Sequence, residues 1–151
     1  MLTRASLIAA GAVACLWQMP ALAQDAAGAF PVPDLTGKWV GPYSVIRSNG
    51  FADGVLELRV IEQKGALLKV EKAWKVAPGG APGDVGGELV TKADEPLVGV
   101  IGFDGREIHL AEQGDEGVYS GRLVGPDTIE LVYIEADRQA TAYRVVLSRE
   151  E

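Results

Sequence analysis

The chain has 151 residues, of which 21 are acidic and 14 basic, with a formal net charge of −7 and a single cysteine. An acidic chain whose basic residues are thinly spread lacks the positive surface that nucleic acid or an anionic membrane would need. One cysteine cannot form an intrachain disulfide, and it excludes metal sites and redox motifs built from several cysteines. We therefore expect no nucleic-acid partner.

Residues 1–23 have the pattern of a secretory signal peptide. A short basic start precedes a run of apolar and small residues, and an Ala-Leu-Ala sequence ending at Ala23 is a small-x-small cleavage site. The apolar run is too short to span a bilayer, so we expect no stable membrane insertion. Cleavage after Ala23 would release a periplasmic or secreted protein without cysteine. Anchoring as a lipoprotein through Cys15 is the alternative.

The remaining chain predicts a flexible alanine- and proline-rich segment over residues 24–33 and one β-domain over residues 34–151. Apolar and polar residues alternate in short runs, and turn residues separate the runs at about 8–12-residue intervals, as in all-β sandwiches and barrels. The expected strands are Lys38–Arg47, Val55–Glu62, Ala66–Val76, Glu88–Thr91, Leu97–Phe103, Arg106–Glu112, Val118–Val124, Thr128–Ala136 and Ala140–Arg149.

The turns between these strands favour one topology. Nearly all are of hairpin length, whereas a Greek key needs at least one long return connection. Asp104-Gly105 predicts a two-residue type I′ turn. The glycine- and proline-rich segment 77–87 cannot form the interior of a strand or helix, and it is the candidate lid. We expect an all-β, antiparallel up-and-down barrel of about eight strands, which leaves room for side chains or one small ligand.

The segment Leu-Thr-Gly-Lys-Trp at residues 35–39 resembles the first-strand motif of lipocalins and avidins, and it follows an irregular lead-in as it does there. The resemblance implies a lipocalin-like calyx in which Trp39 packs across one end of the barrel. It also implies an arginine from a late strand lying on the indole ring. Arg144 is the candidate, with Arg122 and Arg149 as alternatives. The polar residues that read biotin in avidins have no counterparts, so biotin binding is not implied.

Strand alternation predicts the side chains that face the interior. Tyr43, Trp74, Tyr119 and Tyr133 are the candidate ligand-binding residues, with hydroxyl groups that would orient a ligand. The alternative is that these aromatic side chains only fill the core. Lys72 lies on the apolar face of its strand, and we expect its amine to reach water at the barrel mouth. Burial, with a shifted pKa or a bound carboxylate, is the second possibility.

Nothing in the sequence predicts a catalytic or metal centre. His109 is the only histidine and is predicted to point outward, which excludes a metal site made of histidines and a serine-type triad. No run of acidic residues has calcium-loop spacing. We expect no cofactor and no catalytic residue. Five aspartates that separate the predicted strands are interpreted as turn residues: Asp53, Asp104, Asp115, Asp127 and Asp137.

The sequence therefore predicts an exported barrel that binds a small apolar molecule or lipid in its interior, with Lys72 as a partner for an anionic group. Three alternatives stay open. The segment 24–33 could insert into an enzyme's cleft, because the chain also resembles bacterial metalloprotease inhibitors that begin with a Gly-x-Trp strand. A barrel-type isomerase or cyclase would have almost the same sequence as a binding protein. A structural envelope protein would have a filled interior.

Overall fold

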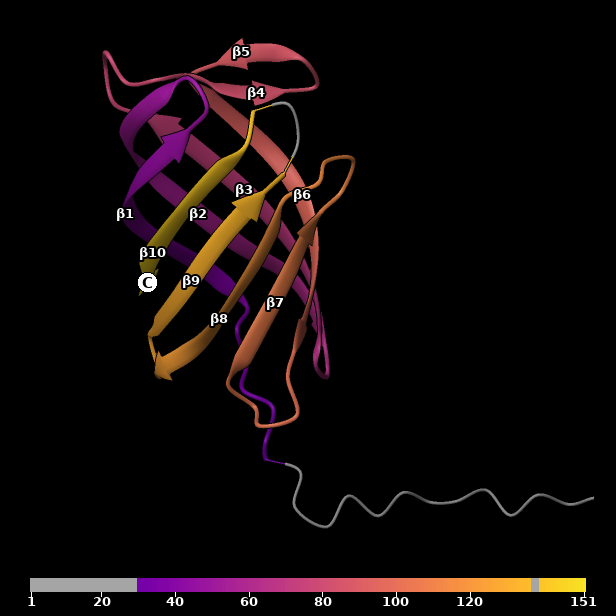
Figure 1. The fold of residues 1–151 in the computed structure, drawn as a ribbon. Coiled ribbons are helices and arrows are strands. Elements are labelled where there is room, and N and C mark those ends of the chain that lie inside the picture. The colour runs from indigo at the N-terminus through magenta and orange to yellow at the C-terminus, as the bar shows by residue number, and fades with distance from the viewer. Residues whose placement is uncertain (1–29, 137–138) are drawn as a thin grey trace, which may run out of the picture.

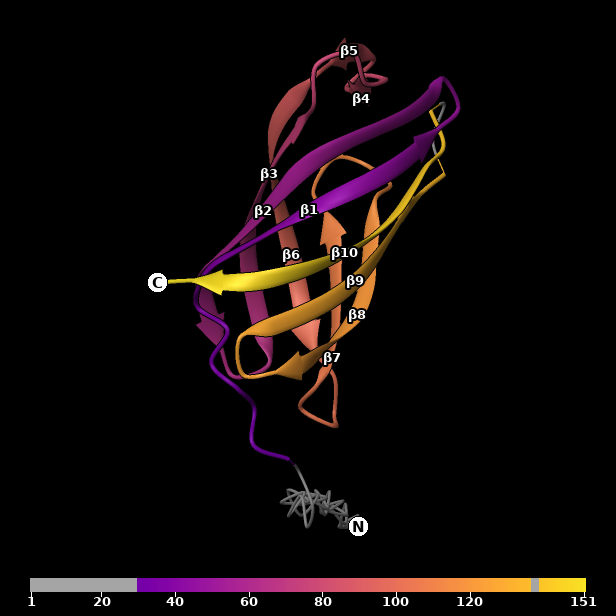
Figure 2. The ribbon, with the colours of Figure 1, turned by 90° about the vertical axis from the view of Figure 1, so that its left-hand side faces the viewer.

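The computed structural model describes residues 30–136 and 139–151. The expected signal peptide and residues 24–29 of the expected flexible segment lie outside the described residues. The described chain forms a closed antiparallel barrel with the strand order β1-β10-β9-β8-β7-β6-β3-β2 (Figures 1 and 2). The predicted all-β barrel is confirmed. Across the described ranges, no helix is long and apolar enough to cross a membrane.

Eight strands make the barrel, and two short strands form a hairpin across one of its ends, at the top of Figure 1. The barrel strands are β1 (Gly37–Arg47), β2 (Gly50–Lys64), β3 (Leu67–Val76), β6 (Lys92–Ile101), β7 (Glu107–Glu112), β8 (Val118–Gly125), β9 (Thr128–Glu135) and β10 (Thr141–Glu150). The hairpin strands are β4 (Gly83–Val85) and β5 (Glu88–Val90).

Strand β2 begins at Gly50, five positions before the predicted start at Val55. Its first residues pair with the end of β1, where Gly50 lies opposite Arg47, so the ladder continues up to the turn. Asp53 is therefore inside a strand, and its interpretation as a turn residue is wrong. Its carboxylate accepts a hydrogen bond from the Ser44 hydroxyl at 2.6 Å on the outer face.

Two other strands differ from the prediction. Strand β6 begins at Lys92 rather than at the predicted Leu97, because β3 offers backbone partners as far as Lys75. The segment 77–87 was expected to contain no strand, but Gly83–Val85 pairs with Glu88–Val90. This segment and its partner strand together make the hairpin that lies across the barrel end.

The β6–β7 connection is longer than the predicted two-residue turn. The Gly105 amide donates to the Gly102 carbonyl at 3.0 Å, which places Asp104 inside a wider turn. Gly105 has a φ of +70°, whereas Asp104 does not adopt the positive φ that a type I′ turn requires. The Asp104 carboxylate instead accepts hydrogen bonds from the amides of Arg106 and Glu107, both at 2.8 Å.

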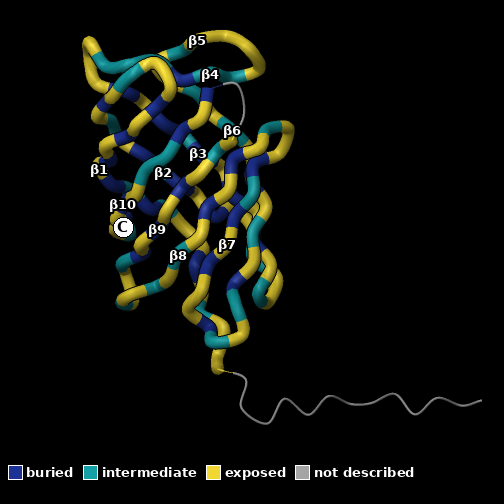
Figure 3. Tube along the Cα trace, viewed as in Figure 1, coloured by how far each residue is buried: buried dark blue, intermediate teal, exposed yellow. Residues whose placement is uncertain are grey.

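Buried and exposed residues alternate along the strands, so every second side chain enters the barrel (Figure 3). In the half of the barrel away from the hairpin these side chains are apolar, and each fully buried one contributes about 1.5–3 kcal/mol. They leave a cavity of only about 20 Å³, lined by Leu35, Trp39, Leu58, Val60, Leu68, Val70, Ile108, Leu110, Ile129 and Leu131. This half of the interior is filled.

The irregular segment before β1 seals this end. Leu35 is buried there, and its amide donates to Gln63 Oε1 at 2.8 Å. The nitrogen of the Gln63 side chain, Nε2, donates to the Pro33 carbonyl at 2.8 Å. The Trp39 indole donates from Nε1 to the Leu35 carbonyl at 2.9 Å. The end of the barrel opposite the hairpin is therefore closed by the lead-in segment.

Arg149 lies on Trp39, and the prediction that Arg144 does so is wrong. The Arg149 guanidinium carbon is 4.3 Å from the centre of the indole ring. Its Nη1 and Nη2 atoms donate to the carbonyls of Thr36 and Asp34 at 2.7 and 2.8 Å. Arg144 alternates with the inward-facing Val145 and is exposed on the outer face. The resemblance implied the correct interaction, and the register of β1 and β10, which places Arg149 directly opposite Trp39, assigns it to the later arginine.

Replacing Arg149 by alanine should lower the free energy of unfolding by about 1–3 kcal/mol, because a cation–π contact and two hydrogen bonds are lost. Arg144→Ala is the matched control from the same strand and should change stability by less than about 0.5 kcal/mol. Urea denaturation of both variants measures the difference. Equal effects of the two substitutions would contradict the assignment of Arg149 as the residue that closes the barrel.

Candidate functional site

All four tyrosines of the chain gather inside the barrel, in the half nearer the hairpin. Tyr43, Tyr143, Tyr133 and Tyr119 come from β1, β10, β9 and β8. The ring centres of Tyr43 and Tyr143 lie 4.8 Å apart, those of Tyr143 and Tyr133 also 4.8 Å, and those of Tyr133 and Tyr119 4.6 Å. The hydroxyls of Tyr119 and Tyr143 share a hydrogen bond of 2.6 Å. The four rings form a continuous aromatic wall.

These phenols remain protonated. Burial raises the pKa of Tyr43, Tyr119, Tyr133 and Tyr143, and the negative charge of Glu112 adds to the increase at Tyr133. A phenol with a raised pKa is a hydrogen-bond donor and an aromatic surface rather than a source of phenolate. The cluster can therefore offer O–H groups and ring faces to a bound molecule.

Lys72 is buried, so the expectation that its amine reaches water at the mouth is wrong. Its ammonium group is ion-paired with Glu95, the residue opposite it on β6, and with Glu112 at the end of β7. It also lies 5.4 Å from the centre of the Tyr133 ring. Burial lowers the pKa of Lys72, and the nearby Glu112 carboxylate acts in the opposite direction. The ammonium is held by two carboxylates.

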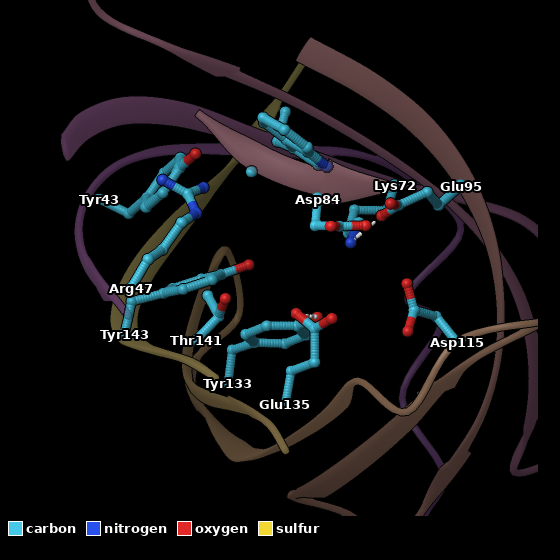
Figure 4. A pocket seen from close by; sticks show the side chains of 12 residues that line it. Tyr43, Arg47, Lys72, Asp84, Glu95, Asp115, Tyr133, Glu135, Thr141 and Tyr143 are labelled. Carbon is cyan, nitrogen blue, oxygen red and sulfur yellow. Dashed lines mark hydrogen bonds and ion pairs between the residues drawn. The ribbon is translucent and has the colours of Figure 1, made fainter. Parts of the chain in front are cut away.

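A cavity of about 30 Å³ lies between this cluster and the hairpin (Figure 4). A space of this size holds roughly two water-sized groups. Aromatic rings and ionisable side chains line it: Tyr43, Arg47, Lys72, Trp74, Asp84, Glu95, Asp115, Tyr133, Glu135 and Tyr143, with Gly83 and Thr141. This cavity is too small for a large apolar molecule.

Acidic groups outnumber basic groups around this cavity. In Figure 4, Asp115 and Glu135 point toward its centre. In the described part of the chain, the Asp115 carboxylate accepts the amide of Glu116, and the Glu135 carboxyl group is hydrogen-bonded to the Tyr133 hydroxyl. Asp84 belongs to β4, lines the cavity from the hairpin side and accepts the Gly87 amide at 2.7 Å. Among the described residues, no basic side chain is ion-paired with any of these three carboxyl groups. The cavity is therefore acidic with aromatic walls.

The β4–β5 hairpin roofs the cavity, and Arg47 and Trp74 hold it there. Arg47 Nη1 donates to the Ala81 carbonyl at 2.8 Å, and the guanidinium lies 5.6 Å from the centre of the Trp74 ring. Gly83 packs on this indole so closely that a Cβ atom at Gly83 would lie 2.7 Å from Trp74 Cη2. A side chain at this position cannot be accommodated without moving the hairpin.

The site does not have the composition of a metal centre. No group of three or more histidine, cysteine, aspartate or glutamate side chains in residues 30–136 and 139–151 is arranged to hold a metal ion. His109 is exposed on the outer face, as expected, with Nδ1 3.4 Å from the Ser120 hydroxyl.

The structure brings the five predicted ligand-binding residues into one half of the barrel. Tyr43, Lys72, Trp74 and Tyr133 line the cavity. Tyr119 lies behind it, packed against Tyr133. Side chains alternate between the inside and the outside of the barrel along each strand, and this alternation brings these residues together. Whether they bind a ligand stays a prediction.

Sequence reasoning missed most of the charged residues of the site. They are Arg47, Asp84, Glu95, Glu112, Asp115 and Glu135, and the missed uncharged residues are Thr141 and Tyr143. Alternation could have identified several, because Glu112 and Glu135 lie two residues beyond the buried Leu110 and Tyr133. Asp115 was interpreted only as a turn residue, and no sequence pattern indicates that its loop points into the barrel.

Lys72→Met should destabilise the protein by about 3–5 kcal/mol at neutral pH, because it leaves Glu95 and Glu112 buried without a cation. Protonation of the two carboxyl groups removes the uncompensated buried charge, so the deficit should shrink as the pH falls from neutral into the acid range. Chemical denaturation across this pH range measures it. Lys69→Met, on the exposed face of the same strand, should have little effect. Equal losses in the two variants would contradict the buried ion pairs.

No family model matches this chain, and no characterised protein matches it in sequence. Among solved structures it is similar to a redesigned β-barrel, mFAP0, bound to DFHBI, with 12% identity, a TM-score of 0.48 and coverage of 76% of this chain and 98% of that one. A second redesigned barrel, b11L5F_LGL, has 13% identity, a TM-score of 0.49 and coverage of 78% and 92%. The S-type phycobiliprotein lyase CPES from Guillardia theta has 12% identity, a TM-score of 0.46 and coverage of 78% and 89%. Membership of the lipocalin or avidin family stays a prediction.

Proposed function

We propose that this protein is an exported binding protein for a small molecule that has a positively charged amine and an apolar or aromatic body. The acidic, aromatic-walled cavity beneath the β4–β5 hairpin is the observation that carries the proposal. The signal-peptide pattern of residues 1–23 supports export.

The charge of the cavity favours a cation. The two basic side chains in the wall are already engaged, Lys72 with Glu95 and Glu112, and Arg47 with the hairpin. An ammonium group placed between Asp115 and Glu135 would gain two charged partners and the faces of the surrounding rings. The net charge of −7 would also attract a cationic ligand from a distance.

A purely apolar ligand, the one expected from the sequence, fits this site less well. It would contact the tyrosine rings and Trp74, but it would cover the carboxyl groups without replacing the water that solvates them. An amine with an apolar body satisfies both parts of the wall. The body would lie against Trp74 and the tyrosine rings, and the head would lie toward Asp115.

The cavity of about 30 Å³ admits an amine head, but not a body of several carbons, unless the hairpin moves. The side-chain contacts that hold the hairpin and the residues just before it are the Arg47 hydrogen bond to Ala81, the Asn49 hydrogen bond to Pro82 and the packing of Gly83 on Trp74. None of these contacts belongs to the barrel ladder. We therefore infer that the hairpin is the lid that opens for the ligand, in agreement with the lid expected at residues 77–87.

Isothermal titration calorimetry with 2-phenylethylamine and with 3-phenylpropionate tests the ligand class. These compounds share an aromatic body and have opposite charges, so the amine should bind and the carboxylate should not. Asp115→Asn should weaken amine binding about tenfold, which corresponds to about 1.4 kcal/mol. Glu116→Asn, at the exposed neighbouring position, should leave it unchanged. Equal binding of the two compounds, or binding of the carboxylate alone, would overturn the proposal.

Gly83→Ala tests the lid. The added methyl group would lie against the Trp74 ring and displace the hairpin, so amide hydrogen exchange across residues 83–90 should become faster. The amine should also associate and dissociate faster in stopped-flow measurements. Leu89→Ala, at an exposed position of the same hairpin, is the control and should change neither rate. Unchanged exchange in Gly83→Ala would show that this contact does not hold the lid.

A further inference from the structure

The Tyr133 hydroxyl lies between two carboxyl groups. Its oxygen is 3.0 Å from Glu112 Oε2 and 3.0 Å from Glu135 Oε2. A phenol has one hydrogen, so it can make one linear hydrogen bond or share a weaker three-centre bond between two acceptors. Two carboxylates at equal distance would therefore compete for one hydrogen. A proton on one of the two glutamates gives each contact its own hydrogen and removes one negative charge from the pair.

The surroundings of the two glutamates differ. The second oxygen of Glu112, Oε1, is ion-paired with the Lys72 ammonium, and the Glu112 side chain is only 2% exposed. An ammonium in direct contact favours the ionised form of a carboxyl group. Glu112 is therefore the carboxylate that accepts the Tyr133 hydrogen. Glu135 makes no ion pair with any described residue, and it is the group left to donate.

The charges that face Glu135 favour the same assignment. The charged groups that act on Glu135 directly are Lys72 on β3, Glu112 on β7 and Asp115 in the β7–β8 loop, beside the Tyr133 hydroxyl of β9. The other ionisable groups that line the same cavity are Arg47 and Tyr43 on β1, Asp84 on β4, Glu95 on β6 and Tyr143 on β10. Carboxyl groups outnumber cations among them. Burial raises the pKa of Glu135, Asp115 and Glu112 raise it further, and Tyr133 and Lys72 lower it.

We propose that Glu135 carries a proton at neutral pH in the unliganded protein, and that it releases this proton to solvent when the amine binds. The second half of this inference rests on the proposed function. The Glu135 O–H bond breaks, the proton goes to water or buffer, and the carboxylate left behind pairs with the ammonium of the ligand. No other bond changes. Glu135 would thus determine specificity, because only a cation compensates for its ionisation.

Infrared spectroscopy of the unliganded full chain at neutral pH tests the first half. A protonated carboxyl group has a C=O stretching band that carboxylates lack. The wild type should show this band and Glu135→Gln should not. Glu130→Gln, on the exposed face of the same strand, should keep it. Absence of the band from the wild type, or its persistence in Glu135→Gln, would overturn the assignment.

A second measurement keeps the test independent of the variant's folding. Carbon NMR of wild-type protein labelled at glutamate side-chain carboxyls should show one group that titrates at higher pH than the others. Glutamates that all titrate near their usual pKa of about 4.3 would overturn the assignment without any substitution. Glutamine at position 135 retains an N–H donor for the Tyr133 oxygen, so we expect the variant to fold.

Calorimetry of 2-phenylethylamine binding, in buffers of different ionisation enthalpy, tests the second half. The wild type should release about one proton per amine bound, and Glu135→Gln should release none. Amine affinity in the wild type should rise up to about tenfold per pH unit until Glu135 is ionised in the free protein. Binding without proton release would overturn the coupling. A carboxylic-acid band in a protein that does not bind the amine would overturn the ligand class and leave the proton on Glu135 established.

Discussion

The backbone hydrogen bonds between β1 and β10 close the sheet on itself, and the interior of this protein is a consequence of that closure. With β1 paired to both β2 and β10, neither edge of the sheet is left open, which matters for a chain with one cysteine and hence no internal disulfide. Closure also confines every second side chain of eight strands to a narrow space. Those side chains must either pack together or find polar partners within it.

The two ends of the barrel meet this requirement differently. At one end the side chains are apolar, and the lead-in segment with Trp39 and Arg149 seals the opening. At the other end, inward positions are occupied by tyrosines, Lys72 and several acidic residues. An isolated buried charge is costly, so these groups are arranged as partners, with Lys72 between Glu95 and Glu112. This division separates a stabilising apolar core from a polar cavity with ionisable side chains.

The hairpin roof connects the polar cluster to the outside of the barrel. Trp74 supports the hairpin from below and Arg47 binds it by hydrogen bond, while both side chains also belong to the cavity wall. Movement of the roof therefore changes the volume and the solvation of the cavity together. When the roof is closed, the low local dielectric strengthens the interaction of a bound charge with the carboxyl groups. In the proposed function, the same elements would control both the access and the affinity of the ligand.

Alternation and turn composition in the sequence were sufficient to predict an antiparallel barrel of about eight strands and which aromatic residues point inward, because these properties are local and have a period of two residues. Strand ends, such as Gly50 and Lys92, depended on how far a neighbouring strand extended. The ionic contacts of Lys72, the place of Asp115 in the cavity wall and the choice of Arg149 over Arg144 were decided by the tertiary structure alone. Each brings together residues distant along the chain, and the register of a closed sheet is what places them in contact.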